Sequence, residues 1–244
     1  MFGLSFARET HREMLDALTG DLSRVNGAKL LVTANLDHIV TLRSNAAFRE
    51  AYADAWRITA DGTPVFLYAK MRGAPLEQRV TGSDLFADLC ARLRPDDHRL
   101  FFLVGTPETG EKIRAYFLAR GFRPDAVTHE VPPFGFEKDE EYSDALAQRI
   151  AASRSTHLVM GVGAPKSEIW AHQHRHWLGN LYVLCIGASV EFFTGEKARA
   201  PQWVKRFGLE WLHRFLSEPR RLFHRYFIRS WGFLAAIVDD LRKS

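Results

Sequence analysis

Short apolar runs rich in β-branched and aliphatic residues alternate along the chain with longer segments in which apolar residues repeat with the helical period. This alternation predicts β-α units on a mainly parallel sheet. The predicted strands cover Lys29–Thr33, Trp56–Ala60, Leu100–Gly105, His157–Val162, Leu181–Gly187 and, at the N-terminus, Phe2–Phe6. The predicted helices cover Leu36–Phe48, Thr63–Met71, Ser83–Leu93, Pro107–Ala119, Asp139–Ser153 and Pro165–Trp177. We therefore expect an α/β fold with a Rossmann-like, mainly parallel sheet flanked by helices.

The last fifty residues have a helical pattern only. Helices are predicted over Val204–Leu216 and from Pro219 nearly to the end, with Ser217 as N-cap and Pro219 in the first turn. We expect two parts, an α/β catalytic domain over residues 1–195 and a C-terminal helical appendage over residues 196–244.

The final predicted helix is amphipathic, with arginines opposite an apolar face. Arg221, Arg225 and Arg229 form the basic stripe. An ordinary surface helix packs its apolar face on the core, whereas an interfacial helix places aromatic and basic residues against anionic lipid, and the two interpretations are compatible. The apolar face consists of Phe223, Phe227, Trp231, Leu234, Val238 and Leu241.

Composition and charge limit the class of protein and the kind of partner that the chain can have. With 244 residues, 46% of them hydrophobic and 25% charged, the chain is globular rather than disordered or fibrous. Residues 196–244 carry eleven Lys and Arg against five Asp and Glu, whereas the preceding residues are slightly acidic. This local basicity indicates a polyanionic partner, either nucleic acid or an acidic membrane surface.

The number of cysteines and the hydropathy of the chain indicate the cellular compartment of the protein. Cys90 and Cys185 are too few for a disulfide framework or a thiolate zinc site, which favours a reducing, cytoplasmic environment. Arg8 and Glu9 interrupt the apolar region that a signal peptide needs, and the uncharged stretch Trp177–Val190 is too short to span a bilayer. We expect neither an export signal nor a transmembrane helix.

Candidate chemistry lies where strands end, because ligands of parallel α/β sheets bind at the carboxyl ends of the strands. Thr33 and Asn35 follow the first predicted strand, and Asn35 either caps the next helix or hydrogen-bonds a ligand there. Asp61 follows the Trp56–Ala60 strand and precedes Gly62. It acts either as a helix N-cap or as a general base for a substrate hydroxyl.

A third junction, Val159–Glu168, places glycines before a helix that Pro165 opens. Such a turn permits close backbone approach, and the helix N-terminus can hold a diphosphate. The sequence is neither a GxGxxG fingerprint nor a Walker A loop, so the usual dinucleotide and NTPase motifs are absent. The turn-rich segment Val131–Gly135 is either a loop over the site or a connection.

The metal-binding alternatives are weak. Glu168, His172 and His176 share i+4 spacing, but the residues between them are polar and no HExxH arrangement is present. The chain contains no Asp-x-Asp pair, so we expect diphosphate chemistry to use protein cations and backbone dipoles, with no metal and no cofactor.

In order along the chain, these segments resemble the WecG/TagA/CpsF family of bacterial glycosyltransferases, and the resemblance covers nearly the whole sequence. The matching motifs are Thr33–Asn35, Ala60–Val65, Arg79–Leu85, Gly161–Trp170, Gly187–Gly195, Arg199–Trp203, Gly208–Arg214 and Glu218–Tyr226.

The resemblance implies an inverting, metal-independent transfer of a sugar from a UDP-sugar to a polyprenyl-diphosphate-linked saccharide in cell-surface polysaccharide synthesis. It implies a peripheral enzyme on the inner face of the cell membrane, with an anionic membrane surface but no nucleic acid as partner. An exposed apolar face on the appendage would also favour a homo-oligomer. Carried over by motif, Asp61 resembles the catalytic base, with Thr33 and Asn35 beside it. The implied substrate-binding residues are Arg79, Gly105, Gly161, Gly163, Lys166, Ser167, Glu168, Arg214, Arg221 and Arg225.

Two positions depart from the family pattern. Ser167 stands where a glutamine is usual, which shortens a pocket contact and bears on donor choice, and Glu191 replaces an aspartate. Two competing interpretations remain open on the sequence alone. One is another nucleotide-dependent α/β enzyme such as an oxidoreductase, and the other is a non-enzymatic basic α/β protein that binds membranes or nucleic acid.

Overall fold

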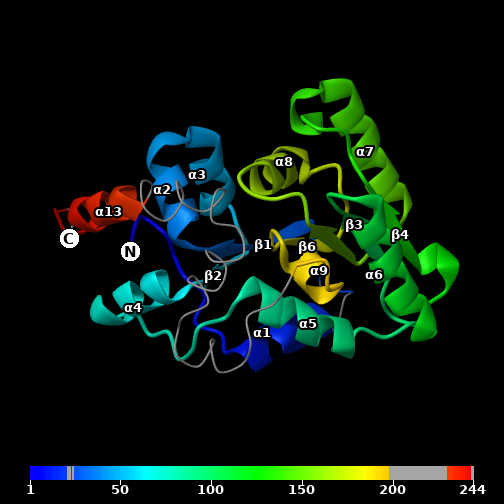
Figure 1. Ribbon diagram of the computed structural model, residues 1–244, viewed down its shortest axis with the longest axis horizontal. Helices are drawn as coiled ribbons and strands as arrows, with labels where there is room; N and C mark the ends of the chain where they lie inside the picture. Colours follow the sequence, from blue (N-terminus) through cyan, green and yellow to red (C-terminus); the bar gives the residue numbers. More distant parts are fainter. Residues whose placement is uncertain (21–22, 24, 198–229, 243–244) are drawn as a thin grey trace.

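A computed structural model describes residues 1–20, 23, 25–197 and 230–242. Within these residues six strands form one parallel sheet in the order β2-β1-β6-β5-β3-β4 (Figure 1). The α/β prediction is therefore confirmed. The strands are β1 (Ala28–Ala34), β2 (Arg57–Ala60), β3 (Leu100–Leu103), β4 (Val127–Glu130), β5 (His157–Met160) and β6 (Leu181–Cys185).

Helices cover both faces of the sheet, and so the central strands are apolar on both sides. Leu30 and Val32 of β1 face one core with α2, α3, α7 and α8, whereas Leu31 faces the other core with α1, α5 and α6. Figure 1 shows α2, α3 and α8 on one side of the sheet and α1 and α5 on the other. The helices are α1 (His11–Thr19), α2 (Leu36–Ser44), α3 (Ala46–Ala53), α4 (Thr63–Met71), α5 (Gly82–Arg92), α6 (Pro107–Ala119), α7 (Glu140–Ala152), α8 (Lys166–His174), α9 (Ser189–Phe193) and α13 (Ser230–Arg242), with 3-10 turns η2 (Pro124–Ala126) and η3 (Phe136–Lys138).

Two element predictions were wrong. Phe2–Phe6 is not a strand, because the segment pairs with no strand and instead lies against α4 and α13. The predicted helix Leu36–Phe48 is two helices, since Asn45 ends α2 and its side chain accepts a hydrogen bond from Phe48 N at 3.0 Å to begin α3. Strand β4 and the helices α1 and α9 were not predicted. In β4 the polar His129 and Glu130 interrupt the apolar run, whereas α1 has a sequence signal that was missed, a Thr10–Glu13 capping box followed by the buried Met14 and Leu18.

Helix α13 packs on the body through a different face from the one that the sequence pattern indicated. Phe233 and Ala236 are buried against the core, and a side chain on Gly232 would collide with Val40 of α2 at 2.9 Å. The predicted apolar face is exposed in its described part, which comprises Trp231, Leu234, Val238 and Leu241. Small residues allow the close approach of α13 to α2, and this approach decides which face is buried.

The described residues of the appendage are few. Phe223, Phe227 and the arginine stripe at Arg221, Arg225 and Arg229 lie outside the described residues, so the predicted boundary after residue 195 stays a prediction. Within the described part of the chain, no helix is long and apolar enough to cross a bilayer.

Candidate active site

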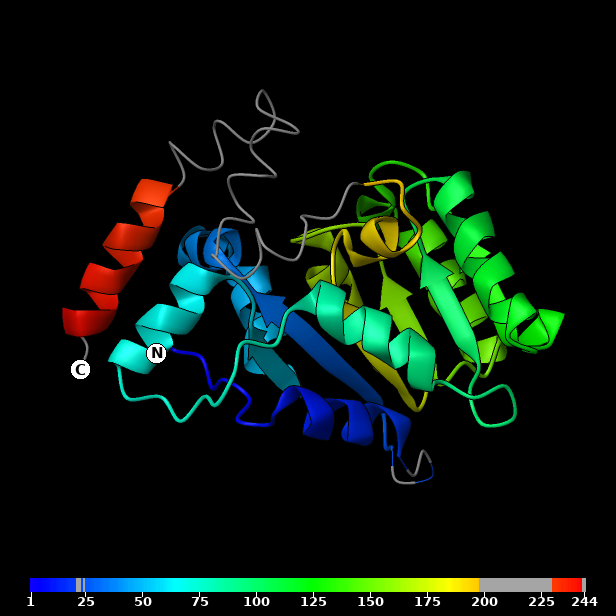
Figure 2. The ribbon, with the colours of Figure 1, turned by 60° about the horizontal axis from the view of Figure 1, so that its bottom comes forward.

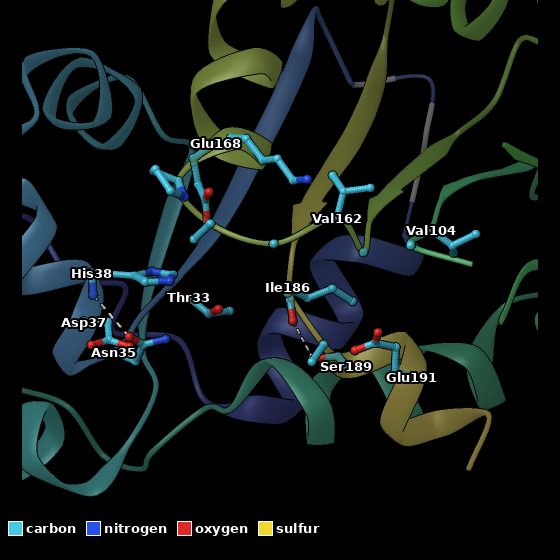
Figure 3. A pocket seen from close by; sticks show the side chains of 18 of the residues that line it. Thr33, Asn35, Asp37, His38, Val104, Val162, Glu168, Ile186, Ser189 and Glu191 are labelled. Atoms are coloured by element: carbon cyan, nitrogen blue, oxygen red, sulfur yellow. Dashed lines mark hydrogen bonds between the residues drawn. The ribbon is translucent and has the colours of Figure 1, made fainter. Parts of the chain in front are cut away.

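A cavity of about 660 Å³ opens at the carboxyl edge of the sheet (Figure 3). The residues that follow β1, β2, β3, β5 and β6 all contribute to its wall, because parallel strands bring their carboxyl ends to one edge. Thr33, Asn35 and Asp61, predicted from two separate junctions, meet here. Gly105, Gly161, Gly163, Lys166 and Glu168 also line the cavity.

The β1 and β2 junctions differ in what their polar residues do locally. Asn35 is the N-cap of α2, and its Oδ1 accepts a hydrogen bond from His38 N at 3.2 Å. Asp61 is not a helix cap, because Gly62 occupies the N-cap position of α4 with φ +89° and no side-chain cap bond forms. The backbone N–H of Asp61 donates to the carbonyl oxygen of Ala34 at 2.8 Å, which holds Asp61 beside the end of β1. The capping interpretation of Asp61 is therefore wrong.

The β5–α8 turn favours glycine at two positions, Gly161 because of a close neighbour and Gly163 because of its positive φ. A Cβ on Gly161 would lie 3.1 Å from the carbonyl oxygen of Leu103, and Gly163 has φ +87°. Ser167 is buried, and its hydroxyl donates to the carbonyl oxygen of Gly163 at 2.9 Å. The Ser167 side chain thus stabilises the turn and is absent from the cavity lining, so its predicted substrate contact stays a prediction.

The Val131–Gly135 segment is a loop over the site, since Pro132, Pro133 and Phe134 line the cavity. The Lys166 ammonium lies 6.0 Å from the ring centroid of Phe134 and 5.9 Å from that of Phe136. Aromatic faces hold the cation without neutralising it. Lys166 therefore stands at the N-terminus of α8, where the positive end of the helix dipole also faces the cavity.

Glu168 extends from α8 into the space that His38 and Thr33 border (Figure 3). Its side chain is 1% exposed, and Oε2 has no hydrogen-bond partner among the described residues. Burial raises the pKa of Glu168 to about 7. The site therefore holds a carboxyl group that carries its proton into the neutral range.

The Glu168, His172 and His176 triad, which the sequence analysis discounted, does not assemble. His172 Nε2 lies 2.9 Å from the carboxylate of Asp54, the C-cap residue of α3, and His176 is exposed beyond the end of α8. No group of three or more His, Cys, Asp or Glu that could hold a metal ion occurs within residues 1–20, 23, 25–197 and 230–242.

Several cavity residues were missed by the sequence interpretation. His38 Nδ1 and the buried Tyr52 hydroxyl are hydrogen-bonded at 2.6 Å, which orients the imidazole in the wall. His38 follows Asn35 by three residues, a spacing that places both in the first turn of α2. On the far wall Lys197 forms an ion pair with Glu191, so the longer carboxylate at this position has a cationic partner.

Five predicted residues are not placed in the cavity wall, one of which is Ser167. Arg79 donates from Nη1 to the Thr63 hydroxyl at 3.3 Å and is not among the lining residues. Arg214, Arg221 and Arg225 lie outside the described residues. Their predicted contacts with substrate stay predictions.

Comparisons with known proteins agree on one family. The model of the Glycosyl transferase WecG/TagA/CpsF family matches residues 1–244. An N-acetylglucosaminyldiphosphoundecaprenol N-acetyl-beta-D-mannosaminyltransferase from Bacillus spizizenii is 30% identical over 200 residues, covering 80% of this chain and 74% of the relative. An enzyme of the same name from Staphylococcus aureus is 27% identical over 228 residues, covering 91% of this chain and 85% of the relative.

Proposed function

The chain belongs to the WecG/TagA/CpsF family of glycosyltransferases, and from this premise we propose that it transfers an N-acetylhexosaminyl group from a UDP-sugar to a polyprenyl-diphosphate-linked saccharide. The names of the relatives specify N-acetylmannosamine as the transferred sugar and an N-acetylglucosaminyl diphosphoundecaprenol as the acceptor. Membership of a glycosyltransferase family decides against the oxidoreductase and the non-enzymatic alternatives. The single observation that carries the proposal is that Asp61, Thr33 and Asn35 meet in a cavity at the sheet edge.

Asp61 is the proposed general base. A sugar hydroxyl is a weak nucleophile at neutral pH, so a carboxylate that takes its proton as the bond forms lowers the barrier. The hydroxyl oxygen of the acceptor attacks C1 of the donor sugar, the bond from C1 to the phosphate oxygen breaks, and UDP leaves with the electron pair. Direct displacement inverts the anomeric carbon. Gly62, and not Asp61, is the N-cap residue of α4, which supports the assignment of Asp61 as the base.

The departing diphosphate gains charge, which protein groups stabilise in the proposed metal-independent reaction. Lys166 and the backbone N–H groups at the N-terminus of α8 stand at the cavity wall. The predicted contributions of Arg214, Arg221 and Arg225 from the appendage would add to them. These lysine, arginine and backbone N–H groups together would offer the positive potential that a divalent cation supplies in other nucleotide-sugar enzymes.

We also propose that the enzyme works at the cytoplasmic membrane surface. The acceptor of the relatives is lipid-linked by name, and Trp231, Leu234, Val238 and Leu241 form an exposed apolar stripe along α13. Residues 196–244 as a whole are basic. An apolar stripe on a basic segment is the composition of an interfacial anchor for anionic lipid.

A donor panel tests the function. The full-length protein is incubated with a short-chain polyprenyl-diphosphate N-acetylglucosamine, EDTA, and the UDP derivatives of N-acetylmannosamine, N-acetylmannosaminuronic acid, N-acetylglucosamine, glucuronic acid or glucose. We expect UDP release and a lipid product heavier by one N-acetylhexosamine with UDP-N-acetylmannosamine alone. Transfer that EDTA abolishes would refute metal independence, and no transfer from any UDP-sugar would refute the donor class.

A further inference from the structure

The charges on the described cavity wall are unevenly distributed. Its carboxyl groups belong to Asp37, Asp61 and Glu191, together with Glu168, which holds its proton into the neutral range, whereas its ammonium groups belong to Lys166 and Lys197. A diphosphate brings further negative charge into this wall. Its binding therefore depends on cations that can turn toward it, and among the described lining residues these are the two lysines.

Lys197 is positioned by Glu191 in two ways. Its backbone N–H donates to the carbonyl oxygen of Glu191 at 3.1 Å, and its ammonium forms an ion pair with the Glu191 carboxylate. Both groups line the cavity, and a Cβ on Gly105 would lie 4.0 Å from Glu191 Oε1. The pair therefore stands at the carboxyl end of β3, across the cavity from the polar residues that follow β1.

This ion pair is suited to exchange. The Lys197 side chain is 27% exposed and that of Glu191 is 20% exposed, so water reaches both partners and weakens their attraction. Glu191 keeps that access to water when its partner leaves, which avoids a buried unpaired charge. The four-carbon stem of lysine lets the ammonium turn while the backbone bond to Glu191 holds the loop in place.

We propose that Lys197 leaves Glu191 on substrate binding and binds the diphosphate group, so that the ion pair positions this cation before substrate arrives. The inference rests on the proposed function, since both the donor and the acceptor of that reaction carry a diphosphate. Lys197 and Lys166 then both contribute positive charge to the cavity wall that holds the ligand. The exchange replaces one carboxylate partner with a group of higher negative charge, which favours it electrostatically.

Titration calorimetry on the full-length protein tests the exchange with three ligands: UDP, uridine and farnesyl diphosphate. For Lys197→Met we expect the diphosphate that uses this contact to bind about 10-fold to 100-fold more weakly, as for the loss of one charge-assisted hydrogen bond. Uridine, which lacks the diphosphate, should bind as it does to the wild type. A loss of affinity confined to UDP would show that Lys197 binds the diphosphate of the donor. A loss of affinity confined to farnesyl diphosphate would show that it binds the diphosphate of the acceptor.

Two further variants separate the contact from general damage. Lys197→Arg keeps the positive charge and should retain most of the affinity, whereas Lys70→Met removes an exposed lysine of α4, outside the cavity lining, and should change nothing. Unchanged diphosphate binding in Lys197→Met, or an equal loss of uridine binding, would overturn the inference alone. A wild-type protein that bound neither diphosphate would overturn the proposed function as well.

Discussion

Asp240 of α13 accepts a hydrogen bond from the Tyr68 hydroxyl of α4 at 2.8 Å, joining residues that are 172 positions apart. The same carboxylate accepts from the backbone N–H of Phe2 and lies 3.9 Å from the Arg72 guanidinium. Burial and, after it, the bond to Asp240 raise the pKa of Tyr68 to about 12. Figure 2 shows α13 beside α4 and the N-terminal segment. One carboxylate thus fastens α13 to α4 and to the N-terminal segment.

Replacing Asp240 by alanine should lower the free energy of unfolding by about 1–3 kcal/mol, because its donors lose a charged acceptor in a largely buried place. Urea unfolding of the full-length protein measures this change. Tyr68→Phe removes one of these bonds and should lower the free energy less than Asp240→Ala does. An unchanged midpoint in Asp240→Ala would show that the carboxylate does not stabilise the fold.

Asp61→Asn should nearly abolish sugar transfer, because the amide cannot accept the proton of the attacking hydroxyl. Binding of UDP should stay close to that of the wild type, since the shape of the cavity is kept. Initial rates of UDP release and calorimetric binding of UDP give the two readouts. Turnover at the wild-type rate would remove Asp61 from the role of base.

The stability of the protein should depend on Glu168 between pH 4.5 and 7. Burial raises the pKa of Glu168 from its ordinary value of 4.5 to about 7, so the unfolded chain loses this proton at a lower pH than the folded one. As the pH rises through this window the folded state is progressively destabilised, by an amount on the order of 3 kcal/mol in total. This destabilisation of the folded state is absent below pH 4.5 and complete above pH 7.

Glu168→Gln removes this titration. We expect the variant to be more stable than the wild type at pH 8 and to approach it at pH 4, measured by denaturant unfolding at each pH. A difference that stays constant with pH would contradict the assigned proton.

The exposed stripe of α13 should contribute to lipid binding. The double variant Leu234→Gln and Leu241→Gln should bind phosphatidylglycerol vesicles at least about 10-fold more weakly in a sedimentation assay, because two leucine side chains no longer enter the interface. Trp177→Gln changes another exposed apolar residue, which lies beyond the end of α8, and serves as the matched control. Equal binding of both variants and the wild type would exclude α13 from the lipid contact.

Much of the fold was predictable from local patterns. Runs such as Leu100–Leu103 and Leu181–Cys185 are apolar on both faces, which is the mark of a parallel strand covered on both sides. The edge strand β4 escaped prediction because one side of an edge strand reaches solvent, and its His129 and Glu130 give no apolar run.

The candidate site was predictable where chemistry follows a strand directly. Thr33, Asn35 and Asp61 each stand within two residues of a strand end, so the topology of a parallel sheet brings them together. His38 and Lys197 were not predicted. The His38 side chain is held in the cavity wall by a hydrogen bond to Tyr52, and that of Lys197 by an ion pair with Glu191. The positions of these two partners depend on how the helices pack on the sheet.

By itself the sequence determined the fold class, the family and the strand-end residues of the cavity, because hydrophobic periodicity and short motifs are local properties of a chain. Only the tertiary structure decided that Gly62 caps α4 in place of Asp61, that Glu168 is buried with an unpartnered oxygen, and that α13 buries Phe233 and not Leu234. These three outcomes depend on which helix surfaces pack against the rest of the protein. Close packing at Gly232 against Val40, and the exclusion of water around Glu168, arise between segments that lie far apart in the chain.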